Sequence, residues 1–275
     1  MRGLIERVVV PLDVAAEHRA ALDTAARLAR RWGARLHGVF VEDSDLIHLS
    51  RLPFARQFSF GVGIEQITEE SVERQIRAFA AAARRDVEAA ARRYGVEWSF
   101  EIAPGAAADA ALIASERDLL VAGSATRPVG THFRIECRWW QTLESAGASF
   151  LVVHCEWAAV HGAVVTLLRD REQASLRVLD AAAHCAAAIG GVLTVACPAD
   201  LAAAPGFEDW LGDRLAPYAL HVQIELAPDE ATALLERFAE LDCALLVLGA
   251  GSIGTQPGWL RQVAAHAACG LLIVR

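Results

Sequence analysis

The chain carries one pattern of residues twice, and this internal repeat constrains its fold more than any other feature of the sequence. Each copy opens with a run of branched apolar residues that ends in an aspartate, Asp13 in RVVVPLD and Asp170 in AVVTLLRD. Further landmarks follow in the same order: Asp23 and Asp180, Gly33 and Gly190, and the paired segments RLHGVFV and VLTVAC, FEIAPG and IELAPD, DLLVAGS and ALLVLGA, SFLVVH and GLLIVR. We therefore predict a tandem duplication, with one domain over residues 1–156 and a second over 157–275.

The apolar segments of each copy predict an α/β fold. They are continuous apolar runs rather than alternating ones, which is typical of strands in a parallel sheet covered on both faces. Helices between them would supply the right-handed connections that parallel strands need. The clearest helix is predicted over residues 69–94, where one apolar stripe contains Val72, Ile76, Phe79, Ala83, Val87, Ala90 and Tyr94.

The two copies differ between their second strand and the helix that follows it. The first copy has an additional segment, 44–64, that mixes Leu, Phe and Arg without a regular period. Two interpretations of this segment stay open, a lid over the first copy's site and an arm that binds a partner. The second copy has Pro198, Pro205 and Pro217 in the corresponding region, so its second helix is expected to be short.

The composition excludes several classes of function. The net formal charge of −8 argues against a nucleic-acid binder. All 26 basic residues are arginines, so the chain lacks the lysine of a Walker-type phosphate loop and any Schiff-base lysine. The six cysteines and nine histidines do not have the spacing of a zinc site, so no metal is expected, and the cysteines are interpreted as buried thiols.

The location of the protein is predicted from two further absences in the sequence. The N-terminal residues lack the pattern of a secretory signal peptide. No apolar run reaches about 18 residues without a charge, which a membrane-spanning helix would need. We therefore expect a cytoplasmic protein without a membrane segment.

The order of elements, the aspartate that closes the first strand and the glycine-rich loop after the fourth strand resemble the universal stress protein family. The resemblance implies, for each copy, an open five-stranded parallel sheet in the order 3-2-1-4-5 with flanking helices, the arrangement called adenine nucleotide α-hydrolase-like. It also implies dimers through the fifth strand. Here the two copies are expected to form that dimer within one chain by pairing 150–154 with 270–274, so a further homodimer would need another surface.

Many members of this family bind ATP and others do not. The family's binding pattern follows strand four and reads Gly, two residues, Gly, nine residues, Gly, then Ser or Thr. Glycines let backbone N–H groups form a concave nest for phosphate, and the hydroxyl lies at a helix N-terminus. The resemblance places the ligand outside the carboxyl ends of strands one and four.

The first copy retains part of this pattern. The resemblance assigns nucleotide contacts to Asp13, to the backbone at Val41 and to Gly123 and Ser124. The second glycine position, however, is Thr126, and the distal Gly-Ser falls on Glu136-Cys137. Arg127, Arg134 and Arg138 follow in this loop. Two interpretations stay open: their guanidinium groups bind an anion in place of the glycine nest, or they are solvated or paired locally.

The second copy retains a different part, in the stretch LGAGSIGTQPGW. Its candidate residues are Asp170, Gly249, Gly251, Ser252 and Gly254, and the spacing from Gly251 to Gly254 fits the family pattern. The distal positions are Ala264-Ala265, so half of the phosphate cradle is missing. We therefore favour a plain turn in which the glycines supply positive φ over an intact phosphate site.

These observations favour a non-catalytic stress-response sensor or adaptor with degenerate nucleotide sites and an unidentified protein partner. A Ser252 nucleophile elbow is disfavoured, because no acid follows this serine in the chain. The alternative is a competent regulator that binds ATP or AMP at the first copy's site. An enzyme of the adenine nucleotide α-hydrolase type is a third class, for which the sequence offers no catalytic pair.

Overall fold

The computed structural model describes residues 5–12, 19–43, 56–59, 63–66, 69–105, 114–123, 147–153, 162–228, 243–251 and 269–275, together with Arg237 and Val263. The elements of the first copy are β1 (Arg7–Leu12), α1 (Arg19–Trp32), β2 (Arg35–Asp43), β3 (Arg56–Ser59), β4 (Gly63–Gln66), α3 (Glu69–Tyr94), β5 (Trp98–Gly105), β6 (Asp118–Gly123) and β7 (Ser149–Val153). Those of the second copy are β8 (Ala163–Leu167), α6 (Gln173–Ile189), β9 (Leu193–Cys197), α7 (Ala199–Ala202), α8 (Phe207–Leu215), the 3₁₀-helix Ala216–Tyr218, β10 (Val222–Leu226), β11 (Cys243–Gly249) and β12 (Gly270–Val274).

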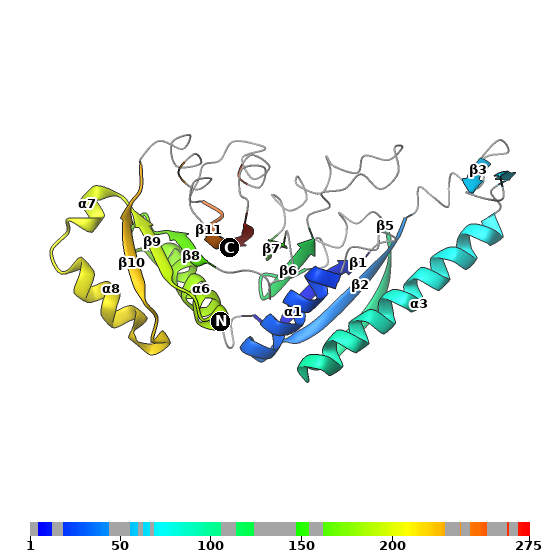
Figure 1. Cartoon of the computed structure of the whole chain (residues 1–275), viewed down its shortest axis with the longest axis horizontal. Coiled ribbons are helices and arrows are strands. Elements are labelled where there is room, and N and C mark those ends of the chain that lie inside the picture. The colour runs from blue at the N-terminus through cyan, green and yellow to red at the C-terminus, as the bar shows by residue number, and fades with distance from the viewer. Residues whose placement is uncertain are drawn as a thin grey trace.

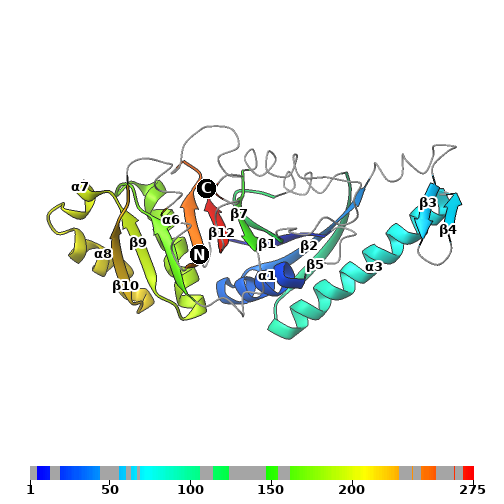
Figure 2. The same cartoon turned by 45° about the horizontal axis from the view of Figure 1, so that its top comes forward.

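The main strands form one ten-stranded sheet in the order β10-β9-β8-β11-β12-β7-β6-β1-β2-β5. Within each half the strands are parallel and follow the predicted order 3-2-1-4-5. The α/β fold class with flanking helices is thereby confirmed (Figures 1 and 2). The domain boundary at residues 156 and 157 lies outside the described residues and stays a prediction.

The two halves join through their fifth strands, β7 and β12. This pair is antiparallel, with Leu271 opposite Val152, Leu272 opposite Leu151 and Ile273 opposite Phe150. The expected pairing of the fifth strands is therefore confirmed for residues 150–152 with 271–273, and it makes the two sheets continuous.

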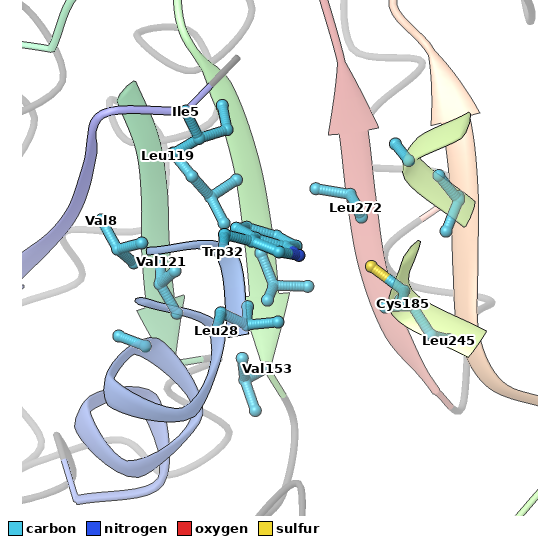
Figure 3. Close-up of a cluster of buried hydrophobic side chains, with 14 of the residues drawn as sticks. Ile5, Val8, Leu28, Trp32, Leu119, Val121, Val153, Cys185, Leu245 and Leu272 are labelled. Atoms are coloured by element: carbon cyan, nitrogen blue, oxygen red, sulfur yellow. The ribbon is translucent and has the colours of Figure 1, made fainter. Parts of the chain in front are cut away.

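One hydrophobic core runs under both halves on the face that α1, α3, α6 and α8 cover. Figure 3 shows Leu28 and Trp32 of α1 with Leu119 and Val153 of the first half, and Cys185 of α6 with Leu245 and Leu272 of the second. A second cluster of buried residues occupies the opposite face, where the helical residue Val263 packs. The continuous apolar strands are explained by this burial on both faces.

Helix α3 has the predicted bounds, but part of its predicted apolar stripe is wrong. The residues buried in this helix are Ile76, Ala80, Ala83, Val87 and Ala91. Phe79 is 41% exposed, and the small Ala80 lies inside in its place. A close approach to the sheet explains this preference: a Cβ on Gly38 of β2 would lie 2.6 Å from Cγ2 of Val87, so any larger residue there would force the two elements to shift.

The second landmark aspartate has the same structural role in each copy. Asp23 of α1 accepts a hydrogen bond of 2.5 Å from the Tyr94 hydroxyl and thereby ties α1 to α3. Asp180 of α6 forms a bidentate pair with Arg214 of α8, at 2.6 and 3.1 Å. The repeat thus preserves a polar link from the first helix of each copy to the helix that packs beside it.

The regions where the copies differ also differ in structure. In the first copy, strands β3 and β4 pair in antiparallel fashion beyond the N-terminal end of α3 (Figure 2). Strand β3 lies in the additional segment, and β4 begins in it and ends just after it. In the second copy, short helices replace the 26 residues of α3, as the prolines predict. The choice between a lid and a partner arm stays open.

Candidate functional site

The candidate site lies at the carboxyl edge of each half of the sheet, where β1 and β6, or β8 and β11, end side by side. The predicted residues Val41, Gly123, Asp170, Gly249 and Gly251 are described there. Six others lie outside the described residues: Asp13, Ser124, Thr126, Arg127, Ser252 and Gly254.

In the first copy, Val41 and Gly123 are the described part of the site. The Val41 side chain is 3% exposed and belongs to the core, so only its backbone is available to a ligand. Gly123 is the last residue of β6, pairs with Val153 of β7, and is exposed, although the rest of its strand is buried. An exposed glycine at a strand end leaves the backbone open to close approach by a ligand.

In the second copy, the Asp170 carboxylate makes a local hydrogen bond. Its Oδ1 accepts a hydrogen bond of 2.9 Å from the backbone N–H of Glu172, at the N-terminus of α6. A short-range bond of this kind is an Asx turn, which fixes the loop and partly satisfies the helix end. The N–H that a phosphate or ribose oxygen could use at this position is thus engaged by the chain itself.

Next to Asp170, the Arg171 guanidinium lies over two aromatic rings of α8. Its Cζ is 4.8 Å from the ring centre of Trp210 and 5.6 Å from that of Phe207, and the two rings stack at 5.8 Å. Arg171 thereby connects the start of α6 to α8 through cation–π contacts. Sequence reasoning missed this contact; the only signal was the spacing of Phe207 and Trp210 on one helical face.

The glycine-rich turn of the second copy has a different backbone from the one predicted. Gly249 is buried in β11 and pairs with Val274, and the Ala250 N–H donates to the Val274 carbonyl at 2.9 Å. Ala250 and Gly251 form a turn, but neither Gly249 nor Gly251 has a positive φ. The prediction that these glycines supply positive φ is therefore wrong for the two described ones, because regular strand pairing continues to Gly249.

A second polar cluster occupies the opposite, amino edge of the first half, and no local sequence pattern predicts it. Arg7 at the start of β1 donates to Asp118 at the start of β6, Nε to Oδ1 at 2.9 Å and a terminal nitrogen to Oδ2 at 2.6 Å. The backbone N–H and hydroxyl of Ser115 donate to the same carboxylate at 2.7 and 2.9 Å. Burial would raise the pKa of Asp118, but these four hydrogen bonds outweigh it and the pKa is lowered.

His37 of β2 lies beside this pair and is buried. Its Nδ1 is 2.8 Å from the Ser99 hydroxyl, and its Nε2 is 3.5 Å from a carboxylate oxygen of Glu101. Burial lowers the pKa of His37, and the positive charge of Arg7 lowers it further. His37 is therefore a neutral hydrogen-bonding residue near pH 7, as expected for a histidine inside a strand.

The second half has no such pair at the matching positions. Strand alignment places Ala163 where the first copy has Arg7, and the matched segments DLLVAGS and ALLVLGA place Ala244 where it has Asp118. The ion pair is thus a feature of one copy and not of the shared fold.

Two features are absent from the described residues. Among them, no group of three or more His, Cys, Asp or Glu side chains could hold a metal ion. In the same part of the chain, no helix has both the length and the apolar character that crossing a membrane requires.

The sequence matches no protein-family model and no curated protein. The structure, in contrast, is similar to solved structures over nearly its whole length. A universal stress protein from Archaeoglobus fulgidus superposes with a TM-score of 0.64 at 12% identity, covering 98% of each chain. A putative universal stress protein from Pseudomonas aeruginosa has a TM-score of 0.59 at 16% identity, covering 98% of this chain and 93% of that one.

The same fold also occurs in another setting. The cytoplasmic domain of a prokaryotic cation chloride cotransporter superposes with a TM-score of 0.55 at 10% identity, covering 98% of this chain and 95% of that domain. A shared fold at this identity does not determine what a chain does. The chain therefore has the fold of these solved universal stress proteins over nearly its whole length.

Proposed function

We propose that this chain is a non-catalytic regulatory protein of the universal stress type, which acts as a sensor or adaptor and whose two nucleotide sites are weakened. The fold supports this proposal, because both halves carry the strand order that places a ligand at the carboxyl ends of strands one and four. The partner is a protein that the sequence does not identify.

The observation that carries the proposal is the local hydrogen bond of the Asp170 carboxylate. An aspartate at the end of strand one would have to face the ligand, yet the Asp170 carboxylate accepts the N–H of Glu172 within its own turn. The neighbouring Arg171 is likewise engaged, on the rings of Phe207 and Trp210. These contacts support a structural role for the residues that follow β8. The sequence supports the same conclusion, because Ala264-Ala265 occupy the positions of the distal Gly-Ser.

The alternative is a regulator that binds ATP or AMP at the first copy. One asymmetry favours this copy over the second: Gly123 is exposed at the end of β6, whereas the equivalent Gly249 is buried. Arg127, Arg134 and Arg138 follow in the sequence and would offer guanidinium groups to an anion.

A calorimetric titration of the full chain with ATP and with AMP tests the proposal. We expect no binding or binding weaker than about 100 μM, which corresponds to less than about 5.5 kcal/mol of binding free energy. Submicromolar affinity for either nucleotide, or hydrolysis of ATP that a site variant abolishes, would refute it.

The repeat supplies a matched pair of variants for the alternative, Asp13→Ala and Asp170→Ala. These aspartates occupy equivalent positions in the two copies. If the first copy binds nucleotide, Asp13→Ala should weaken binding at least tenfold, while Asp170→Ala should leave it unchanged. The reverse result would assign the site to the second copy.

A further inference from the structure

Two cysteines of the second half lie in direct contact. Cys243 is the first residue of β11, and Cys269 immediately precedes β12. Their sulfur atoms are 2.6 Å apart, whereas a disulfide bond is about 2.05 Å long. Both residues are held as thiols here, and a displacement of about half an ångström would bring the sulfurs to bonding distance.

The strand geometry explains how the two side chains meet. Parallel pairing of β11 with β12 places Leu245 opposite Gly270, so the two cysteines belong to adjacent rungs at the amino end of this pair. Strict alternation would turn Cys243 to the face of Leu245 and Val247, away from Cys269. The register shifts between Cys243 and Leu245, however, and Cys243 packs in the same cluster as Cys269. An extra residue of this kind reverses which face a side chain occupies.

We propose that Cys243 and Cys269 form a reversible disulfide bond when the protein meets a hydroperoxide such as hydrogen peroxide. This site is independent of the proposed nucleotide function. It changes the interpretation of these cysteines from inert core residues to a reactive pair, because a contact between two thiols is what disulfide formation requires.

The reaction balances in two steps. The Cys269 thiolate attacks one oxygen of the peroxide, the O–O bond breaks, and the departing hydroxide takes up the proton that the thiol released, giving Cys269 sulfenic acid and water. The Cys243 sulfur then attacks the Cys269 sulfur as it loses its proton, the S–O bond breaks, and the departing hydroxide becomes a second water. Two thiols are oxidised by two electrons, and one peroxide is reduced to two waters.

The surroundings of the pair favour this order of events. The two thiols share a hydrogen bond in which either sulfur can donate, and this contact lowers the pKa of Cys269 despite its burial, so Cys269 is the better source of the thiolate. Cys243 is only partly buried, which leaves an approach from solvent at the pair. In contrast, Cys185 is fully buried and burial raises the pKa of its thiol to about 12, so it should resist the same oxidant.

The disulfide would close a loop that contains the whole glycine-rich turn. The two cysteines are 26 positions apart, and Gly249, Gly251, Ser252 and Gly254 all lie between them. It would also join β11 to β12, the strand that binds the two halves together. Oxidation would therefore restrict the segment between the two cysteines, which contains most of the second copy's candidate residues.

Peptide mapping of the full chain tests this directly. Since the chain has no lysine, trypsin cuts only after arginine and separates peptide 238–261, whose one cysteine is Cys243, from peptide 262–275, whose one cysteine is Cys269. The folded protein is treated with hydrogen peroxide, remaining thiols are alkylated under denaturing conditions, and the digest is analysed without reductant. We expect a linked species of these two peptides, with two hydrogens fewer than their sum, that dithiothreitol converts back.

Cysteine variants test which residues form the linked species. Cys243→Ser and Cys269→Ser should each abolish the linked species, whereas the matched control Cys185→Ala should retain it. Recovery of both cysteines fully alkylated after peroxide treatment of the wild-type protein would overturn the proposal. So would linkage of either cysteine to any other cysteine in preference to its neighbour. The wild-type map decides the question even if a serine variant fails to fold.

Discussion

Replacing Arg7 by alanine would leave the Asp118 carboxylate buried with only the two hydrogen bonds from Ser115. Its side chain is 1% exposed, so water cannot fully replace the two bonds that Arg7 donates. Removing one member of a buried pair costs about 3–5 kcal/mol of unfolding free energy. Because the Arg7 side chain is 36% exposed and water can enter where it was, we take the lower end, about 3 kcal/mol.

Asp118→Ala and the double variant complete a double-mutant cycle. Asp118→Ala removes the buried charge but leaves the Ser115 donors without their acceptor, at a cost of about 2 kcal/mol. The double variant Arg7→Ala/Asp118→Ala contains no buried charge, so we expect a loss of about 2.5 kcal/mol, well below the sum of about 5. The second half of the protein already has Ala163 and Ala244 at these positions, so the fold accepts the alanine pair.

Urea unfolding of the four proteins, followed by circular dichroism, measures the coupling as the difference between the double variant and the sum of the single ones. We expect about 2.5 kcal/mol at pH 7. The pKa of Asp118 is lowered in the folded state, so its contribution is complete above the ordinary aspartate value of about 3.9 and is lost as pH falls below it. Additive single variants at pH 7, or a coupling that does not shrink in acid, would refute this reasoning.

Two further predictions concern packing and pH. Gly38→Ala should lower the unfolding free energy by about 1–3 kcal/mol, since its Cβ would lie 2.6 Å from the buried Val87. As a control, Gly212→Ala in α8 meets no atom within 4 Å and should be neutral or stabilising. Equal unfolding midpoints for the two variants would contradict the packing argument. The pKa of His37 is below its ordinary value because of burial and the Arg7 charge, so protonation favours the unfolded chain and stability should fall as pH drops through about 6.5. An NMR titration that gave His37 a pKa at or above that ordinary value would contradict this.

The fold was predictable because two features of the local sequence, the repeat and the apolar runs, indicate it. Most strands of the main sheet are contiguous apolar segments, although the edge strands β5 and β10 include polar residues, and the paired landmarks set the equivalence of the two halves. The bounds of α3 followed from the length of its apolar stripe, which runs from Val72 to Tyr94. The stripe on α3 was less predictable, because the choice of Ala80 over Phe79 depends on how closely the helix approaches Gly38, which is a tertiary property.

The polar contacts were much less predictable than the fold. Arg7 and Asp118 are 111 positions apart, and no local pattern links them. The Cys243–Cys269 contact depends on a register shift, which apolar periodicity does not reveal. The engagement of Asp170 by Glu172 is local, but an aspartate at the end of a strand is equally suited to a ligand, so its sequence alone does not distinguish the two roles.

The antiparallel seam between β7 and β12 has an evolutionary consequence. In a dimer of identical subunits, every substitution appears on both sides of the two-fold axis at once. Here each side of the axis is encoded separately, so a change can be accepted on one side while the other keeps its earlier residue. The charged pair in one half and the sulfur pair in the other are two such differences between halves that share one strand order.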